Sequence, residues 1–402
     1  MTTAQRPIVL RARWLVCSPE RLLEGASLVI RGGRIERIAA RRLRVAGARE
    51  LDFGDAILAA GMVNAHAHLE LGALAGQTPR GADFAAWVRT VIALRGKTSR
   101  PQLVQAARSG ATRALETGTT CVLDVDTTSA AALALARHPI RSVVLREVLD
   151  AHDPARTRVA LARVRRPLQV CGRRREGVSP HAPFTVSPAL LAGVAGLARS
   201  RALPVQMHWS ETLAELEWMR SGSGPLAGLL GPSPRRSALD LLEEVGLLGP
   251  GLSLVHGNHP ARGEARRLAS RGVAIVHCPG SHAWFERERW DWRGYARAGV
   301  EIALGTDSLA SNEDLDLRRE LRLAAAAQRG LSPEQLWRAA TVAGAVAAGA
   351  SHDLGRLERG FWADVLVLPT SARSAGAALE ELCLGSQPVT EVWVEGRRVA
   401  GR

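Results

Sequence analysis

Eight short apolar runs, each followed by a helical segment, constrain the fold of this chain most strongly. The segments between the runs are rich in alanine, leucine and arginine. Strands that alternate with helices are typical of a parallel sheet with helical connections, and eight such units match a (β/α)₈ barrel. The runs span residues 57–63, 120–125, 141–148, 177–181, 205–208, 252–256, 273–277 and 301–305.

Almost every run ends in a residue that can do acid–base or metal chemistry. Six of the eleven histidines lie at these predicted strand ends. Active sites of such barrels lie at the carboxyl ends of the strands, so we expect these side chains to converge and predict an enzyme. The residues are His66, His68, Asp124, Asp126, Arg146, Glu147, His181, His208, His256, His277 and Asp307.

Both ends of the chain have β character. Residues 26–38 contain two β-type runs around Gly32 and Gly33, which indicates a hairpin. Residues 363–368 and 392–399 show the same character after a long helical stretch. We therefore predict a small composite β-sandwich domain built from residues 1–56 and 354–402, with the barrel in residues 57–353.

The composition is that of an ordinary soluble globular protein, with 46% hydrophobic and 23% charged residues. No apolar run approaches the roughly 20 residues that span a bilayer, and the N-terminus lacks the pattern of a secretory signal. We therefore expect a cytoplasmic protein without a membrane partner. The five cysteines are scattered and form no CxxC pair, so we expect reduced thiols and no cysteine zinc site.

The net charge of +14 raises the possibility of a nucleic-acid partner. All but one of the 53 basic residues are arginine, however, and they are spread over the whole length without a basic motif. Nucleic-acid binding depends on clustered basic residues, so we expect no nucleic-acid partner.

The pair His66 and His68 is the first candidate for a metal site. Side chains two residues apart on an extended segment face the same side, so both imidazoles can reach one ion. Taken alone, the pair is equally compatible with a polar strand end. His208, His256 and Asp307 at three further strand ends favour the metal site, and these donors suit Zn²⁺, or alternatively iron or manganese.

The combined pattern resembles the amidohydrolase superfamily, in particular the branch of cytosine, guanine and S-adenosylhomocysteine deaminases and triazine hydrolases. The resemblance is carried by His66 and His68, by His208 followed three residues later by Glu211, and by His256 and Asp307. Residues 354–365 also resemble the return of the superfamily's chain into its composite β domain. The resemblance therefore extends over nearly the whole sequence.

This resemblance implies a hydrolytic deaminase. One divalent ion, Zn²⁺ or Fe²⁺, would be held by His66, His68, His208 and Asp307. Glu211, His256 and Asp307 would be catalytic, with a metal-activated water displacing ammonia from a purine, pyrimidine or nucleoside derivative. Two-metal members of the superfamily use a carboxylated lysine, but Lys97, the one lysine here, lies outside every run. We therefore expect a single ion.

Two other functions remain open. The same site could release chloride or an alkylamine from a triazine-like ring, or open a cyclic amide as imidazolonepropionase does. Alternatively, the barrel could be an inactive binding protein, although every expected ligand and proton carrier is present. Ammonia release separates the first possibility from deamination.

Six further residues are candidate substrate contacts. Arg146 could bind an anionic group or form an internal salt bridge, and Glu70 could face the ring or support the metal ligands. Trp87 lies at a spacing that is more often core packing. We also expect a homo-oligomer, most simply a dimer. The candidate contacts are His181, Glu70, Arg146, Trp87, His282 and Ser308.

Overall fold

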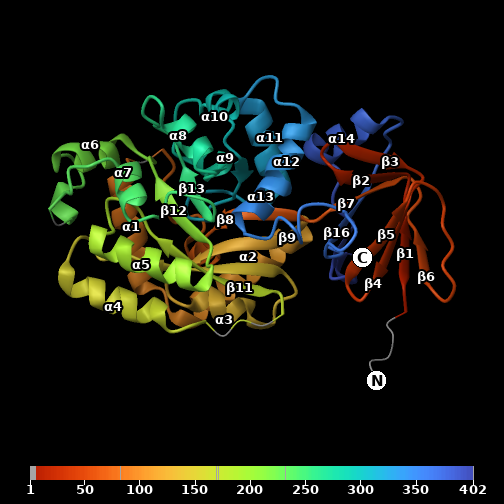
Figure 1. Cartoon of the computed structure of the whole chain (residues 1–402), viewed down its shortest axis with the longest axis horizontal. Coiled ribbons are helices and arrows are strands. Elements are labelled where there is room, and N and C mark those ends of the chain that lie inside the picture. The colour runs from red at the N-terminus through yellow and green to blue at the C-terminus, as the bar shows by residue number, and fades with distance from the viewer. Residues whose placement is uncertain (1–5, 82, 169, 171, 231, 402) are drawn as a thin grey trace.

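The computed structural model describes residues 6–401 except 82, 169, 171 and 231. Its centre is an eight-stranded parallel sheet in which consecutive strands are neighbours, and helices surround it (Figure 1). This confirms the predicted barrel. Its strands are β8 (Met62–Ala67), β9 (Thr119–Asp126), β10 (Arg141–Val148), β11 (Arg174–Pro180), β12 (Val205–Trp209), β13 (Leu252–His256), β14 (Ala274–His277) and β15 (Ile302–Leu304).

The barrel closes between its last and first strands. Ala67 and Asp307 form a parallel bridge, and the backbone N–H groups of Thr306 and Asp307 both donate to the carbonyl of His66. Gly305 permits this approach, because a Cβ atom there would lie 2.7 Å from the Cβ of His66. Closure therefore brings Asp307 beside the His66–His68 segment, although about 240 residues separate them in sequence.

Nine of the α-helices begin at a residue whose side chain caps the first turn. These capping residues are Asp83, Asp153, Ser187, Thr212, Ser237, Asp291, Asp316, Ser332 and Ser374. The α-helices are α1 (Phe84–Lys97), α2 (Arg100–Glu116), α3 (Ala130–Ala134), α4 (Pro154–Arg165), α5 (Pro188–Arg201), α6 (Leu213–Ser221), α7 (Ala238–Glu244), α8 (Glu264–Ser270), α9 (Pro279–Trp284), α10 (Trp292–Ala298), α11 (Leu317–Ala327), α12 (Pro333–Ala340), α13 (Val342–Ala347) and α14 (Ala375–Leu384). Short 3₁₀ helices are η1 (Leu69–Leu74), η2 (Leu135–Arg137) and η3 (Ala227–Leu229).

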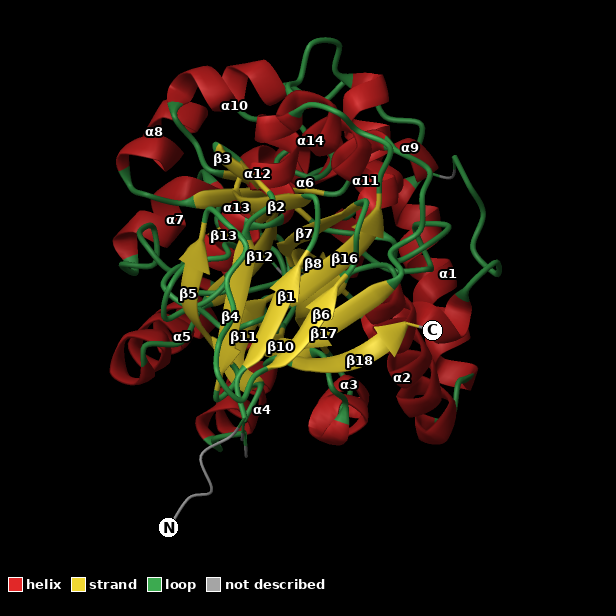
Figure 2. Cartoon of the chain, turned by 90° about the vertical axis from the view of Figure 1, so that its right-hand side faces the viewer, coloured by secondary structure: helices red, strands yellow, loops and turns green. Residues whose placement is uncertain are grey.

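Two further sheets form the small domain at the other end of the molecule (Figures 1 and 2). A four-stranded sheet has the order β5-β4-β1-β6, and a six-stranded sheet has the order β18-β17-β16-β7-β2-β3. Leu28 and Ile30 of the first sheet share a buried apolar cluster with Leu58, Val365 and Trp393 of the second. The predicted β-sandwich from both chain ends is thus confirmed. The strands are β1 (Ile8–Arg11), β2 (Trp14–Ser18), β3 (Arg21–Glu24), β4 (Ser27–Arg31), β5 (Arg34–Ala39), β6 (Arg49–Asp52), β7 (Ala56–Ala60), β16 (Val365–Pro369), β17 (Glu391–Val394) and β18 (Arg397–Gly401).

The first apolar run requires a correction. Residues 57–63 are not one barrel strand, because Ala56–Ala60 pairs with β16 and β2 in the six-stranded sheet. The barrel strand begins at Met62, after Gly61, where a Cβ atom would collide with Thr120. Two buried strands in succession read as one run, because both are apolar on both faces. The limits of the three domain segments stay a prediction.

The described cysteines Cys17, Cys121, Cys278 and Cys383 are buried free thiols, as predicted, and Cys171 lies outside the described residues. In the part of the chain that the structure describes, no helix has the length and apolar character that crossing a membrane requires.

Candidate metal centre and active site

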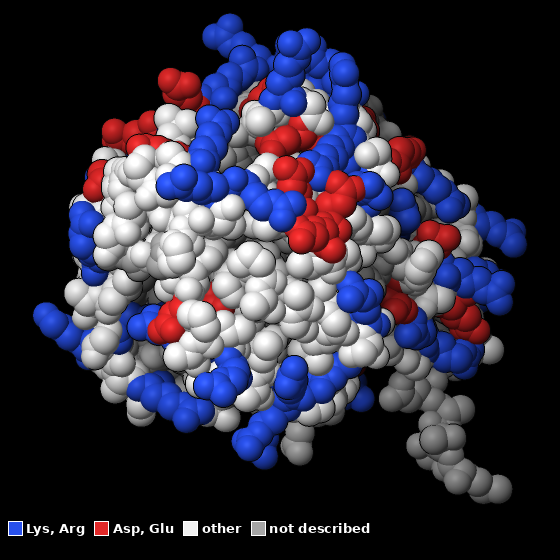
Figure 3. Space-filling view, turned by 60° about the vertical axis from the view of Figure 1, so that its left-hand side comes forward, with Lys and Arg blue, Asp and Glu red and all other residues white. Residues whose placement is uncertain are grey.

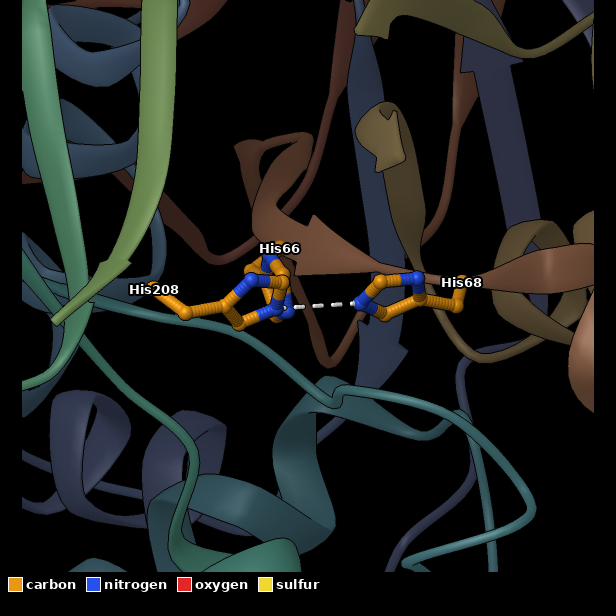
Figure 4. Close-up of side chains that lie close together, drawn as sticks. All are labelled: His66, His68 and His208. Carbon is orange, nitrogen blue, oxygen red and sulfur yellow. Dashed lines mark hydrogen bonds between the residues drawn. The ribbon is translucent and has the colours of Figure 1, made fainter. Parts of the chain in front are cut away.

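Three imidazoles and one carboxylate meet at the carboxyl ends of the barrel strands. His66 lies in β8, His68 directly follows it, His208 lies in β12, and Asp307 follows β15. Figure 4 shows the rings of His66 and His208 next to each other, with the ring of His68 facing them. The Nε2 atoms of His68 and His208 are 3.3 Å apart, and Asp307 Oδ1 lies 3.8 Å from His66 Nε2 and 3.9 Å from His68 Nε2.

These spacings fit a bound metal ion. Two nitrogens that each lie about 2.05 Å from an ion at a tetrahedral angle are about 3.3 Å apart. His66 Nε2 is buried and has no hydrogen-bond partner. The ligand atoms of His66, His68 and His208 lie within 4.8 Å of one another, as do those of His66, His256 and Asp307. The donor set therefore suits one divalent ion.

Neighbouring groups fix the orientation of these side chains. Nδ1 of His66 lies 2.7 Å from Gln206 Oε1, and Nδ1 of His208 lies 2.8 Å from the carbonyl of His181. Both Nδ1 atoms therefore donate, which leaves both Nε2 atoms as acceptors for an ion. Ser281 Oγ donates to Asp307 Oδ2 at 2.7 Å and leaves Oδ1 facing the histidines.

Burial keeps the imidazoles neutral. It lowers the pKa of His66 to about 4, and it lowers the pKa values of His68 and His256 well below their usual range. Burial acts in the opposite direction on the pKa of Asp307, but His66 and His256 lower that pKa overall. At neutral pH the rings of His66, His68 and His256 are thus unprotonated and Asp307 is a carboxylate, the forms that bind metals.

The backbone around the site adopts an uncommon conformation. His256, Asp307 and Ser210, which precedes Glu211, have φ values of 75°, 58° and 51°. Non-glycine residues rarely adopt this left-handed region, which typically holds strain of about 1–3 kcal/mol per residue. Trp290 Nε1 holds the carbonyl of His256 at 2.8 Å. Such strain concentrates at functional sites, where the surrounding structure holds reactive side chains in place.

Glu211 lies beside the ligand cluster. Its Oε2 is 3.6 Å from His256 Nε2, and its Oε1 accepts a hydrogen bond of 2.9 Å from Arg287 Nη2. The buried Glu215 carboxylate accepts from the backbone N–H groups of Ser210 and Glu211 and thereby fixes this turn. Burial raises the pKa of Glu215 to about 8. Glu211 is thus held rigidly where a proton carrier is required.

A pocket of about 360 Å³ opens above the cluster. Its walls are mainly apolar. Its floor is formed by His68, His208, Glu211, His256 and Asp307. On the side of the molecule that lies on the left in Figure 1, uncharged side chains cover much of the surface, with acidic and basic side chains above them and mainly basic ones below (Figure 3). The apolar wall residues are Leu71, Phe84, Trp87, Val88, Val91, Ile92, Leu149, Ala151, Phe184, Leu226, Leu230 and Phe285.

Three of the six predicted substrate contacts line this pocket, namely His181, Trp87 and Ser308. His181 is held through Nδ1 by Thr185 Oγ1 at 2.7 Å, and burial lowers its pKa to about 4. Trp87 donates through Nε1 to the carbonyl of Ala310, so the helical spacing that suggested core packing places its ring on a pocket wall instead.

The other three predicted contacts are not among the described residues that line the pocket, and as substrate contacts they stay predictions. Arg146 forms a 2.6 Å ion pair with Glu176 and donates to carbonyls at the end of α4, so the internal salt bridge holds. Glu70 is fully buried and bonded to Thr128. His282 donates through Nε2 to the carbonyl of Glu288, and its ring packs against that of His277.

Two residues at or near the pocket, Arg95 and Arg287, were missed, and Glu147 was expected at a strand end but not as a pocket residue. Glu147 lines the pocket. Strand alternation could have indicated this, because adjacent residues of β10 face opposite sides. Only one of Arg146 and Glu147 can therefore face inward. Glu147 accepts from Thr127 Oγ1 at 2.6 Å; burial raises its pKa, but His181 and His68 lower it overall to about 2. Arg95 and Arg287 carried no signal beyond their charge.

Comparisons with known proteins agree with this geometry. Residues 57–399 match the model of the amidohydrolase family. Aminodeoxyfutalosine deaminase of Deinococcus radiodurans is 36% identical over 311 residues, 72% of each chain. 5-Methylthioadenosine/S-adenosylhomocysteine deaminase of Thermococcus kodakarensis is 29% identical over 85% of this chain and 81% of its own. An adenosine deaminase structure from Xanthomonas campestris with bound zinc is 27% identical, with a TM-score of 0.83 over 98% of this chain and 93% of its own.

Proposed function

We propose that this chain, which belongs to the amidohydrolase family, is a metal-dependent hydrolytic deaminase of a purine nucleoside. The observation that carries the proposal is the joint position of the ligand cluster and Glu211 in one pocket. His66, His68, His208 and Asp307 supply the donors for an ion, and Glu211 supplies a proton carrier beside it. Family members that open cyclic amides and members that deaminate share the metal-ligand cluster. A glutamate beside the heterocycle of a bound substrate, the place of Glu211, supports deamination.

The ligand set supports one divalent ion, Zn²⁺ or Fe²⁺, bound by His66, His68, His208 and Asp307. Such an ion, when bound, lowers the pKa of a water molecule to roughly 7. The zinc in the adenosine deaminase relative favours Zn²⁺. Lys97 is the exposed last residue of α1 and belongs to no barrel strand, which supports a single ion.

The side chains of the pocket divide the remaining chemistry between them. Asp307 accepts the proton of the attacking water, and His256 orients that water from the neighbouring strand end. Glu211 donates a proton to the ring nitrogen adjacent to the carbon under attack. The proton held by Asp307 then passes to the amino group, which leaves as ammonia, and Glu211 takes back the proton of the new hydroxyl. Arg287 holds Glu211 in position through its 2.9 Å contact. Positioned acid–base groups of this kind typically contribute 10²- to 10⁴-fold to the rate.

The relatives support an adenine ring with a modified 5′ position. Their names specify aminodeoxyfutalosine, 5-methylthioadenosine and S-adenosylhomocysteine, and 5'-deoxyadenosine in a further relative from Methanopyrus kandleri. The pocket of about 360 Å³ is large enough for a ring and a substituent, and aromatic side chains such as Trp87 and Phe285 can pack against the base. The predicted dimer and the cytoplasmic location stay predictions.

The test is the release of ammonia from a panel of adenine nucleosides with different 5′ substituents, together with adenine, cytosine, guanine and aminotriazines. We expect ammonia release from 5′-substituted adenosines, with the loss of adenine absorbance as a second readout. Release of chloride or an alkylamine from triazines, with no nucleoside turnover, would instead favour the alternative leaving group. A metal-loaded protein without turnover on any of these compounds would contradict the proposal.

A further inference from the structure

Glu320 is a fully buried carboxylate on the apolar face of a helix. It lies in α11, on the face whose residues Leu317, Leu321 and Ala324 belong to the main apolar cluster. These four positions follow the spacing i, i+3, i+4 and i+7, at which a helix usually carries apolar side chains. Burial of a carboxylate costs free energy unless hydrogen bonds replace the lost water. The partners of Glu320 therefore indicate what its burial achieves.

Both oxygens of Glu320 accept hydrogen bonds from segments outside its own helix. Oε2 accepts from the backbone N–H of Gly280 at 2.6 Å, and Oε1 accepts from Asn312 Nδ2 at 2.9 Å. Gly280 lies in the first turn of α9, and Asn312 lies in the loop between β15 and α11. A Cβ atom at Gly280 would lie 2.3 Å from Asn312 Oδ1, so glycine permits the two segments to meet. Glu320 thus links α9 to this loop.

Each of the two segments holds Asp307. Ser281, in the same turn of α9, donates from Oγ to Asp307 Oδ2 at 2.7 Å. Asn312 Nδ2 donates at 2.7 Å to the carbonyl of Thr306, the residue directly before Asp307. Two series of contacts therefore lead from Glu320 to Asp307, one to its carboxylate and one to its backbone.

The backbone contact matters because Asp307 has a φ of 58°, in the left-handed region. A non-glycine residue keeps this conformation only where the surrounding structure holds it. The peptide group between Thr306 and Asp307 is held at both ends, since its carbonyl accepts from Asn312 and its N–H donates to the carbonyl of His66. Release of the carbonyl would leave one of these two anchors.

The Asn312 amide can hold that carbonyl in one orientation. Its Oδ1 accepts from the N–H of Glu313 and from Arg319 Nη1, both at 2.8 Å, and its Nδ2 donates to Thr306 and Glu320. All four hydrogen-bonding positions of the amide are thus used. Glu320→Gln would offer one acceptor oxygen to two donors, so one contact would be lost and an NH₂ group would face a donor.

We propose that Glu320 is a positioning residue of the metal site, which keeps Asp307 in place as a ligand through α9 and through the loop before α11. Glu320 is not among the described residues that line the pocket, so it acts through Asp307. This inference rests on the proposed function, in which Asp307 binds the ion. Loss of groups that support metal ligands typically lowers metal affinity or activity by 10- to 100-fold.

The test measures the zinc affinity of the full chain by competition with a chromophoric chelator at pH 8. This pH keeps Glu320 ionised, because burial raises its pKa to about 7. We expect Glu320→Gln to weaken zinc binding by about 10- to 100-fold. The absorption bands of the Co²⁺-loaded protein, which depend on ligand geometry, should change as well.

Glu176→Gln is the matched control. The buried Glu176 carboxylate also accepts from a backbone N–H, that of Leu168, and it pairs with Arg146 near the amino end of β11. This variant should bind zinc as wild type does. Denaturant unfolding of the two metal-free variants shows whether a comparable loss of stability accompanies the different zinc affinities.

A double-mutant cycle separates positioning of Asp307 from a general loss of packing. If Glu320 acts through Asp307, Glu320→Gln should weaken zinc binding much less in an Asp307→Asn background than in wild type. A general effect would be equal in both backgrounds. Should Glu320→Gln fail to fold, Asn312→Ser removes the link to the Thr306 carbonyl and carries the same expectation.

Weaker zinc binding and altered cobalt bands in Glu320→Gln, but not in Glu176→Gln, support the inference when the Asp307→Asn background removes the effect. Wild-type zinc affinity in Glu320→Gln overturns it. An equal loss in the control, or in both backgrounds of the cycle, overturns it as well, and each of these results leaves the proposed deaminase intact. Zinc binding that depends on Glu320, in a protein that releases no ammonia, would contradict the proposed function alone.

Discussion

The two ends of the barrel both bury charged groups, but they treat them differently. At the end next to the small domain, Arg141 pairs with Asp364 at 2.7 Å and with Glu395 at 3.1 Å, and Arg173 also pairs with Glu395. The Trp362 ring lies against the guanidinium of Arg141 as well as that of Arg34. At the opposite end, His66 Nε2 has no partner and the histidine rings crowd one another.

This difference separates structural from functional burial. Charges beside the small domain are neutralised within the chain, as expected where they fix the contact between two parts of a protein. At the carboxyl ends of the strands, Glu211 and Asp307 each accept a hydrogen bond from within the chain, but His66 Nε2 has no hydrogen-bond partner. The left-handed backbone at His256 and Asp307 belongs to the same end. Substitutions at the carboxyl ends of the strands should therefore reduce activity, and substitutions beside the small domain should reduce stability.

The largest effect is expected from His208→Ala. This change removes a predicted metal ligand, so the purified protein should lose its ion and at least about 10³-fold of its activity. Plasma emission analysis should find about one equivalent in wild type and almost none in the variant. Two equivalents in wild type would contradict the single-ion prediction.

Arg141→Met should act on stability instead. It leaves the buried Asp364 carboxylate without its guanidinium, and loss of one partner of a buried pair typically destabilises by about 3–5 kcal/mol. Denaturant unfolding measures the change, and metal content per folded chain should stay at the wild-type level. Arg31→Met breaks an exposed pair with Glu36 and is the control, with an expected loss below about 1 kcal/mol. Equal losses in the two variants would remove the distinction between the barrel ends.

Glu211→Gln should leave metal binding intact and lower kcat by about 10²-fold or more. The amide keeps the shape of the side chain but cannot carry the proton to the ring. Turnover and metal content of the same preparation are measured together. A variant with undiminished kcat would show that another group carries the proton.

The smallest effect is that of pH on the free energy of unfolding through the histidines. This effect belongs to the barrel, because every histidine lies between His66 and His352. Burial lowers the pKa of His282 to about 4, whereas an unfolded chain has about 6.5. The unfolded state therefore takes up the proton first, and the stability from neutral His282 is complete above pH 6.5 and falls as the pH drops toward 4. His282→Gln should weaken this loss by about 2 kcal/mol between pH 7 and 5. Unfolding curves of metal-free protein at both pH values measure it, and parallel losses in the two proteins would contradict the assignment.

Much of the fold could be predicted, because strand and helix patterns are local. Seven of the eight runs coincide with barrel strands to within a few residues, and the Gly32–Gly33 hairpin joins β4 and β5. The exception at residues 57–63 arose because two successive strands, in different sheets, are both fully buried. An apolar run does not reveal which sheet a strand joins.

The sequence by itself determined the chemistry available at the strand ends, because the reactive residues stand at or just after the apolar runs. These residues are His66, His68, His208, Glu211, His256 and Asp307. Only the tertiary structure decided which side chains face the pocket. Glu147 faces inward and Arg146 outward because the packing of β10 against α4 sets the phase of the alternation. Likewise, the apolar face of α1 resembles any core-facing stripe in sequence, and its position over the cavity makes Trp87 and Arg95 pocket residues. Such choices depend on contacts between residues far apart in the chain, which local patterns do not specify.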